Sequence, residues 1–276
     1  KFLQRNNHML ITIAIIVDLL IILFSLKYAW WYPKANMKKT RIMMYHMISN
    51  QLANGKKSGL RVSPEMFEKQ LKYFKENGWK FIKMSELKNY ENENKVVAIT
   101  FDDGYLDNYS QALPLLKKYG ACATLYLVID RHQNDWSVKK NPKHNTGVLA
   151  DEEKLSDDNI KEMVDSGVFE LGGHTITHPY LPNTSIENKK YEMTECKNIL
   201  ETTFNTKVSS FAYPFGIYSA EDVKIIETSN FESAVTTEEG VANAITPFEL
   251  KRIKASGKDN FFAFKLRVHK GFRGFI

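Results

Sequence analysis

Residues 95–104 read KVVAITFDDG, an apolar stretch that runs directly into two carboxylates and a glycine. The β-branched residues 95–101 predict a buried strand, and Asp-Asp-Gly predicts the turn that ends it. Outward along the chain, strand-like runs alternate with helix-like segments. We expect further strands at residues 41–48, 121–129, 168–171, 209–213 and 231–236, and helices at residues 64–77, 111–119, 157–166, 187–204 and 220–229. This alternation is typical of a parallel α/β sheet or barrel.

The composition is that of an ordinary globular protein. Of the 276 residues, 43% are hydrophobic and 25% are charged, which excludes fibrous and largely disordered classes. The net charge of +6 comes from scattered lysines rather than a dense basic block, so we expect no nucleic-acid partner. A mildly basic surface would equally suit an anionic membrane or a cell-wall polymer. We expect a monomer.

The two cysteines, Cys122 and Cys196, do not form a Cys-x-x-Cys pair, which excludes a thiolate zinc site. They are interpreted as two buried or half-buried free thiols. A single disulfide is the alternative if the domain lies outside the cytoplasm.

A long apolar segment precedes the α/β region. Residues 9–26 read MLITIAIIVDLLIILFSL, in which 15 of 18 positions are apolar. As a helix, this segment is about as long as the hydrocarbon core of a bilayer is thick. The aromatic residues that follow it, as an interfacial belt would, are Tyr28, Trp30, Trp31 and Tyr32.

These features predict four parts of the chain: a tail at 1–8, a single transmembrane anchor at 9–28, a linker at 29–40 and a catalytic domain at 41–276. A cleaved signal peptide is the alternative to the anchor. The basic residues that follow the apolar segment oppose an external domain by the positive-inside rule. We nevertheless place the domain outside the cytoplasm, because of the chemistry described next.

Asp102 and Asp103 stand side by side at the end of the strand that opens this section. Side chains alternate along a regular strand, so a turn at Gly104 is needed for both carboxylates to reach one site. Such a pair suits a division of labour in which one carboxylate binds a metal and the other acts as a base. A plain surface turn is the alternative.

His174 and His178 lie in the stretch Gly-Gly-His-Thr-Ile-Thr-His. At a spacing of four they would share one face of a helical turn, so that both imidazoles reach one metal. Two histidines and one carboxylate make a standard open zinc site. Two unrelated surface histidines are the alternative.

A third stretch, Phe-Ala-Tyr-Pro-Phe-Gly at residues 211–216, leads from a strand into a turn. Such a turn can direct a backbone N–H into a site and line it with aromatic rings, which suits a sugar face and an oxyanion. A plain turn is the alternative.

Together these motifs resemble those of the polysaccharide deacetylases of carbohydrate esterase family 4, the NodB-homology domain. The resemblance extends from about residue 41 to about residue 268. It implies a distorted (β/α)7-type barrel and a divalent metal, Zn²⁺ with Co²⁺ or Ni²⁺ as alternatives. The implied roles are a general base (Asp102), metal ligands (Asp103, His174 and His178), a brace for the histidine loop (Thr175), and residues at the substrate and oxyanion (Tyr213, Pro214 and the backbone N–H of Phe215).

The chain departs from the usual family pattern at Ala212, where an arginine that positions the base normally stands. The Ala-Tyr-Pro-aromatic-Gly form is similar to the subgroup that acts on β-1,6-linked poly-N-acetylglucosamine. In that subgroup the general-acid histidine comes from an N-terminal Tyr-His stretch, which implies His46 here. His269, near the C-terminal apolar run, is the rival. Arg252 could replace the missing arginine, with a solvated basic strand end as the alternative.

The resemblance therefore implies hydrolytic N-deacetylation of N-acetylglucosamine units in an extracellular polysaccharide, most specifically a β-1,6-linked biofilm polymer. Peptidoglycan and chitin-like polymers are the alternatives within the same chemistry, and O-acetyl xylan is less favoured. A non-catalytic carbohydrate-binding protein is the alternative of another class. We expect a membrane-anchored enzyme whose catalytic domain is extracytoplasmic.

Overall fold

The structure is a computed structural model that describes residues 2–50, 58–132, 149, 151–243 and 245–274. Its strands are β1 (Arg41–Tyr45), β2 (Met47–Ile48), β3 (Arg61–Val62), β4 (Lys80–Ile82), β5 (Val96–Asp103), β6 (Ala123–Leu127), β7 (Phe169–Gly173), β8 (Ser210–Ala212), β9 (Ser233–Glu239) and β10 (Leu250–Lys254). Its α-helices are α1 (Phe2–Tyr28), α2 (Pro64–Glu76), α3 (Leu113–Tyr119), α4 (Asp157–Asp165), α5 (Ile186–Phe204), α6 (Ala220–Thr228) and α7 (Phe261–Lys270).

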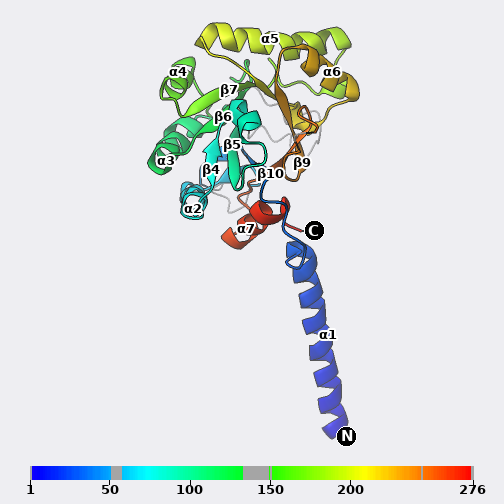
Figure 1. The fold of residues 1–276 in the computed structure, drawn as a ribbon. Coiled ribbons are helices and arrows are strands. Elements are labelled where there is room, and N and C mark those ends of the chain that lie inside the picture. Colours follow the sequence, from blue (N-terminus) through cyan, green and yellow to red (C-terminus); the bar gives the residue numbers. More distant parts are fainter. Residues whose placement is uncertain (1, 51–57, 133–148, 150, 244, 275–276) are drawn as a thin grey trace.

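The main sheet closes on itself as a barrel (Figure 1). Its order is β1-β10-β9-β8-β7-β6-β5, and β1 also pairs with β5, which completes the ring. Every pairing in the ring is parallel. β4 pairs with the first residues of β5, before the part of β5 that pairs with β6. β2 pairs with β3 in a small separate sheet. The expectation of a distorted (β/α)7 barrel is therefore confirmed.

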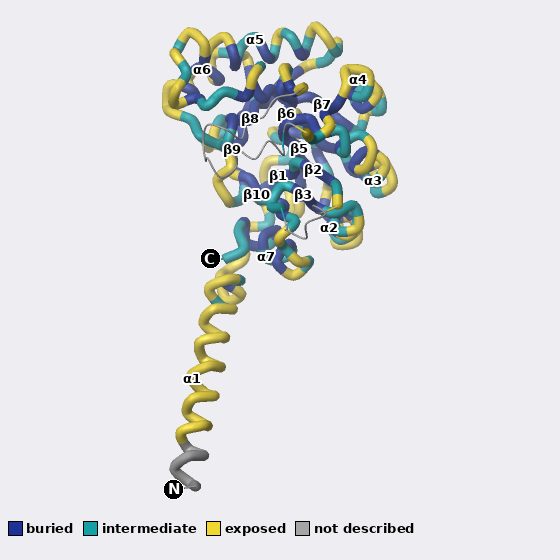
Figure 2. Tube along the Cα trace, turned by 180° about the vertical axis from the view of Figure 1, so that it is seen from behind, coloured by how far each residue is buried: buried dark blue, intermediate teal, exposed yellow. Residues whose placement is uncertain are grey.

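The strands are buried on both faces, as Figure 2 shows along the tube. In β5, Val97, Ile99 and Phe101 belong to the large core under the helices, whereas Val96 and Ala98 belong to a smaller cluster that fills the barrel. Strands covered on both sides read as continuous apolar runs, which is the pattern of residues 95–101.

The barrel interior is narrow, and one aromatic ring fills much of it. Tyr126 on β6 is fully buried and packs against Gly172 of β7. A Cβ atom at Gly172 would lie 2.4 Å from the Tyr126 ring, so only glycine fits there. The guanidinium of Arg252 lies over the other side of the ring, 5.7 Å from its centroid.

The expected helices and strands are found, with boundary shifts of one to a few residues, but several elements were not expected, among them β3, β4, β10 and α7. β4 is only three residues long, and α7 was recognised only as an apolar run. β10 reads Leu-Lys-Arg-Ile-Lys, a charged sequence that does not indicate a buried strand. It is nevertheless the strand that closes the ring between β9 and β1, because its arginine finds a partner inside.

The helix α1 projects from the barrel as a single rod and its apolar residues are exposed (Figures 1 and 2). The segment His8–Tyr28 is long and apolar enough to cross a membrane, a test that a signal sequence also passes. The helix already begins at Phe2, within the segment expected as a tail.

The C-terminal helix α7 packs against the end of α1. Lys270 Nζ donates hydrogen bonds to the carbonyl oxygens of Tyr28 and Ala29 at the last turn of α1. The centroids of the Tyr28 and Phe262 rings lie 5.4 Å apart, and the N–H of Ala35 donates to the carbonyl of His269. The chain then enters β1 at Arg41, so α1 and α7 lie at the end of the barrel where the strands begin, here called the amino end.

Neither cysteine forms a disulfide. Cys122 is half-buried and Cys196 is buried on α5, and both are free thiols, as the first of the two interpretations held.

Candidate active site

The expected site residues converge at the opposite end of the barrel, where the strands finish, here called the carboxyl end. β5 finishes with Asp102 and Asp103, the histidine loop follows β7, and the aromatic turn follows β8. Parallel strands bring such segments to one edge, which is where α/β barrels form their sites.

The two carboxylates reach the same site because the backbone changes direction at Asp103. Even-numbered residues of β5 face the barrel interior, and Asp102 continues that series. Asp103 would face the helices, but its φ of 79° turns it into the left-handed region. The change was expected at Gly104, whose φ is 90°, and the structure shows that it begins one residue earlier. Left-handed backbone at a non-glycine residue is strained and is found mainly where a site requires it.

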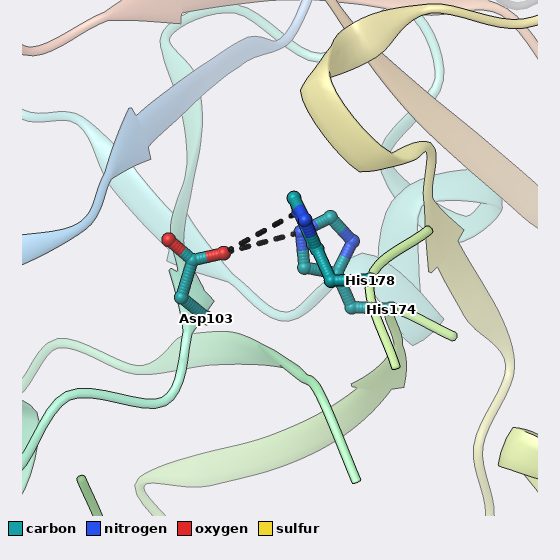
Figure 3. Close-up of side chains that lie close together, drawn as sticks. All are labelled: Asp103, His174 and His178. Atoms are coloured by element: carbon teal, nitrogen blue, oxygen red, sulfur yellow. Dashed lines mark ion pairs between the residues drawn. The ribbon is translucent and has the colours of Figure 1, made fainter. Parts of the chain in front are cut away.

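Asp103, His174 and His178 form a compact set of metal-ligand groups, and Figure 3 shows their side chains pointing toward one another. Asp103 Oδ1 lies 3.4 Å from His174 Nε2 and 3.7 Å from His178 Nε2. All three side chains are buried. Ligand atoms at about 2.0–2.1 Å from a tetrahedral zinc lie roughly 3.3–3.5 Å apart. The donor set and its spacing therefore fit one small divalent cation.

The two histidines do not share a helical turn, and that part of the sequence argument was wrong. The segment after β7 is an irregular loop in which Thr175 and His178 both have positive φ values, 67° and 55°. The side chain of Thr175 holds this loop, because its hydroxyl donates to the His174 carbonyl and accepts from the His178 N–H at 3.0 Å. The bracing position expected of Thr175 is thus the one that the structure shows.

The His174 ring is oriented from behind by the backbone of β8. Its Nδ1 lies 2.7 Å from the carbonyl oxygen of Ala212, an acceptor, so Nδ1 carries the proton. Nε2, which faces Asp103, is then the lone-pair nitrogen that a metal requires. Backbone carbonyls commonly fix metal-binding histidines in this way.

Asp102 is held by Arg252 from β10. Arg252 Nη1 and Nη2 donate to the two carboxylate oxygens of Asp102, each at 2.7 Å, and both side chains are buried. Arg252 Nε donates to the carbonyl of Thr236 at 2.8 Å. The alternative of a solvated basic strand end is wrong, because Arg252 is 1% exposed. Arg252 is thus an arginine that contacts Asp102 from a strand other than the one that carries Ala212.

The charges of the site follow from these contacts. Burial alone would raise the pKa of Asp102, but the Arg252 guanidinium outweighs it and holds the pKa below its ordinary value. Burial also opposes ionisation of Asp103, and the surrounding histidines, His174 first, lower its pKa overall. Burial and the neighbouring His174 lower the pKa of His178 to about 3. Burial opposes a charge on His174, but its hydrogen bond to Asp103 and the charges of Asp102 and Asp103 raise its pKa overall. The arrangement is thus two carboxylates that favour a proton on His174, beside a neutral His178.

His46 lies at the site, and His269 does not. Tyr45 pairs with Phe101, which places His46 beside Asp102 at the carboxyl end. Burial lowers the pKa of His46, while the charges of Asp103 and Asp102 oppose that shift. His269 lies on α7 at the amino end, where its Nε2 is 2.8 Å from the hydroxyl of Tyr73.

The aromatic turn brings one ring to the site. Phe215 has a φ of 58°, and its ring lies edge-on to the His178 imidazole with centroids 4.5 Å apart. Gly216 is needed there, since a Cβ atom would lie 1.9 Å from Thr237 Oγ1. Pro214 is buried in the turn, and Tyr213 donates from its hydroxyl to the carbonyl of Phe248 at 3.1 Å. The Tyr213 phenol is therefore used in the scaffold and does not line the site.

Two further residues at the site were not anticipated. Asn108 Nδ2 donates to the carbonyl of His46 at 2.8 Å and holds the end of β1 in place. Tyr105, next to Asp103 in the fold, is 1% exposed, and burial and the Asp103 charge raise its pKa. Both follow the Asp-Asp-Gly turn closely in sequence. That closeness to the motif is the one signal in the sequence that could have indicated them.

Comparisons with known proteins agree with this geometry. The family model for polysaccharide deacetylases matches residues 89–234. A protein of Bacillus subtilis that is named as a polysaccharide deacetylase is 31% identical over 218 residues, covering 77% of this chain and 70% of that protein. The poly-β-1,6-N-acetyl-D-glucosamine N-deacetylase of Staphylococcus aureus is 27% identical over 201 residues, covering 67% of this chain and 63% of that enzyme. The match thus spans less than two thirds of the staphylococcal enzyme.

Among solved structures, a deacetylase of Streptococcus pyogenes in complex with acetate is similar to this chain. The two are 30% identical with a TM-score of 0.67, and the match covers 79% of this chain and 93% of the streptococcal one. The barrel and the sequence motifs are thus shared with known deacetylases.

Proposed function

The chain belongs to the polysaccharide deacetylase family, and we propose that it is a metal-dependent N-deacetylase of extracellular, β-1,6-linked poly-N-acetylglucosamine. Family membership implies a hydrolase that acts on amides. The proposal adds three points to this family assignment: a bound metal, the polymer and the location of the protein. Each of them rests on its own observation.

The observation that carries the proposal is the pairing of Asp102 with Arg252 directly beside the Asp103, His174 and His178 set. A protein that only bound polysaccharide would have no use for a buried, ionised carboxylate held in one orientation. Ala212 was the main argument for such a binding protein, and Arg252 removes that argument. The site has a base and a metal-ligand set in contact, which supports catalysis.

Within this proposal the groups of the chain divide the reaction. A divalent cation held by Asp103, His174 and His178 would polarise the acetyl carbonyl and make water a better nucleophile. Asp102 accepts the water proton as the new C–O bond forms. The Phe215 N–H donates to the carbonyl oxygen as negative charge develops there. The C–N bond then breaks, and acetate and a free glucosamine amine leave.

His46 is the group that supplies a proton to the leaving nitrogen. Burial lowers the pKa of His46 and favours its neutral form before the reaction. The proton that His46 passes to the nitrogen is then the one that Asp102 takes from water. The charges of Asp102 and Asp103 favour its uptake. His269 is too far away for this role, because it lies at the amino end with Tyr73.

The β-1,6 polymer is supported by two features of the sequence and by one relative. The Ala-Tyr-Pro-Phe-Gly turn and the Tyr-His end of β1 both have the form of the β-1,6 subgroup. The staphylococcal relative is named for that polymer. The cell-wall polymers remain the alternative that a substrate comparison tests.

The contact between α7 and α1 supports a retained membrane anchor over a cleaved signal peptide. Lys270 satisfies carbonyl groups at the last turn of α1, and the linker backbone bonds to α7 through Ala35. Removal of α1 would take away the Tyr28 carbonyl from Lys270 and the Tyr28 ring from Phe262. The site lies at the other end of the barrel, so a bilayer around α1 would leave it facing outward, toward a polymer beyond the membrane.

Acetate release by the full chain in detergent tests the function. The substrates are β-1,6- and β-1,4-linked N-acetylglucosamine pentamers, each with added Zn²⁺ and with chelator, and Asp102→Asn is the matched inactive control. Chelator-sensitive release from the β-1,6 pentamer alone is the expected result. Release mainly from the β-1,4 pentamer would overturn the polymer assignment and keep the chemistry. Polymer binding with no acetate release would overturn the enzyme proposal.

A further inference from the structure

We infer that Glu192 on α5 is a positioning residue that sets the spacing of the two metal-binding histidines. Its carboxylate reaches the loop between them and accepts three hydrogen bonds. Oε2 accepts from the N–H groups of Ile176 and Thr177 at 2.8 and 2.9 Å, and Oε1 accepts from the Thr177 hydroxyl at 2.6 Å. The inference rests on the proposed function, because it concerns the same metal-ligand set.

The two N–H groups belong to the residues that connect the histidines. The His174 ring is held from one side by the carbonyl oxygen of Ala212 on β8. Ile176 and Thr177 connect His174 to His178, so the path of their backbone affects the spacing of the two imidazoles. A single carboxylate oxygen that binds both N–H groups fixes that path.

The loop needs such support because its backbone is strained. Thr175 and His178 both have left-handed backbone, a region that non-glycine residues rarely adopt. Such strain persists only where the surroundings over-determine the conformation. The Thr175 hydroxyl supplies one restraint from within the loop, and Glu192 supplies three from outside it.

The element that carries Glu192 is held rigidly against the site. α5 packs on the end of β7, where a Cβ atom at Gly173 would lie 3.1 Å from Cys196 Sγ. Cys196 and Met193, the residue next to Glu192, are both fully buried. The Glu192 side chain is 9% exposed, and a buried carboxylate is tolerated only where it is fully hydrogen-bonded. Its hydrogen bonds are all made to the histidine loop.

Binding of Zn²⁺ to the metal-free full chain in detergent tests this inference. The variants are Glu192→Ala, Glu192→Gln and Thr177→Val, with Glu195→Ala as the matched control. Glu195 lies one turn along the same helix, and its side chain meets only the exposed Asn198. Thermal unfolding of each metal-free variant is measured beside the zinc Kd, so that loss of fold and loss of positioning are read separately.

Glu192→Ala is expected to weaken zinc binding by about 10- to 100-fold, as loss of groups that orient metal ligands does elsewhere. Thr177→Val removes one of the three bonds and is expected to weaken it by about 2- to 10-fold. Glu192→Gln keeps an acceptor oxygen for the two N–H groups and should stay within about threefold of the wild type. Glu195→Ala should match the wild type. With Co²⁺ as a probe, the absorption spectrum should change in Glu192→Ala only.

An unchanged zinc Kd in Glu192→Ala, with a lowered unfolding temperature, would show a purely structural role and overturn the inference. The proposed function would stand in that case. If Glu192→Ala does not fold, an unchanged Kd in Thr177→Val overturns the inference instead. Absence of zinc binding in the wild type would overturn the metal site itself, and with it both proposals.

Discussion

Each end of the barrel buries an arginine, and the two arginines have different partners. At the carboxyl end, Arg252 forms a two-bond pair with the Asp102 carboxylate. At the amino end, Arg41 donates mainly to backbone carbonyls, among them those of Val268 and Asn36 at 2.9 and 2.6 Å, and also to the Met37 sulfur at 3.5 Å. Burial without an acidic partner lowers the pKa of Arg41 to about 10.

The difference separates what holds the fold from what carries the chemistry. Arg41 joins β1, the linker and α7, so its bonds connect segments that are far apart in sequence. Arg252 orients a carboxylate that the fold does not need. The carboxyl end also places strained, left-handed backbone at residues that the site uses, namely Asp103, Thr175, His178 and Phe215. Left-handed backbone also occurs at the amino end, at Ala29 and Lys95, but those residues are not part of the site.

The largest effect is expected at the base. Asp102→Asn should lower the rate of acetate release by about 10²- to 10⁴-fold, because the amide cannot accept the water proton. Zinc titration of the same variant should give the wild-type Kd, since Asp102 is outside the ligand set. A variant that turned over like the wild type would show that the base has been assigned to the wrong residue.

The two histidines give the next test of the comparison between the ends. His46→Asn should lower kcat by about 10²-fold, as loss of a proton donor does. His269→Asn, at the amino end, should leave kcat within about twofold. Steady-state acetate release on the same pentamer measures both. The reverse ranking would move the general acid to α7 and would contradict the site as described.

Exchange of the two arginines for methionine tests which of them acts in catalysis, since both changes lower stability. Arg252→Met leaves Asp102 buried without its partner, so the free energy of unfolding should fall by about 3–5 kcal/mol and kcat should fall as well. Arg41→Met should lower the free energy of unfolding by about 1–3 kcal/mol and leave kcat of the folded enzyme unchanged. Denaturant titration and acetate release are measured on each. An equal loss of kcat in both variants would contradict the division between the ends.

The smallest effect is a pH dependence at Asp107, which follows the carboxyl end of β5. Burial raises its pKa from 3.8 to about 6, although the Ile48 N–H and Ser49 oppose this shift. The fold therefore binds this proton more tightly than the unfolded chain does, and stability falls as pH rises from about 4 to 6.

Asp107→Asn removes this loss. Relative to the wild type, the variant should gain at most about 3 kcal/mol between pH 4 and pH 8, with most of the change near pH 5. Denaturant midpoints at each pH measure the difference, and Asp165→Asn on α4 serves as a control that should show no such gain. If the difference in unfolding free energy between variant and wild type did not change with pH, ionisation of Asp107 would not destabilise the fold, and the prediction would be wrong.

The sequence predicted the site best where the residues that form it are neighbours in the chain. Asp102 and Asp103, the two histidines and the Pro-Phe-Gly turn each lie in one short stretch after a strand, and a parallel barrel must bring those stretches together. The strands and helices around them followed from apolar periodicity, because their buried faces are continuous.

The parts that were missed depend on contacts across the fold. Arg252 was named as a replacement for the missing arginine, but the buried strand that carries it was not expected, because that strand is charged and Asp102 lies 150 positions away. The histidine loop was expected to be helical because a spacing of four fits a helix. The left-handed backbone that replaces it is fixed by Thr175 and Glu192, and the sequence spacing holds no sign of either contact.

The hydrogen bonds from Lys270 to the end of α1 hold the barrel against the N-terminal helix, so the two are in direct contact (mounted) and not joined by a free linker (tethered). A tethered enzyme would search a hemisphere whose radius is the length of its linker. A mounted one holds its site at one height above the anchor and samples only the polymer that passes through that thin layer. If α1 spans a bilayer as proposed, deacetylation would follow the order in which strands of polymer emerge past the membrane, so the pattern of free amines along a chain would record its passage.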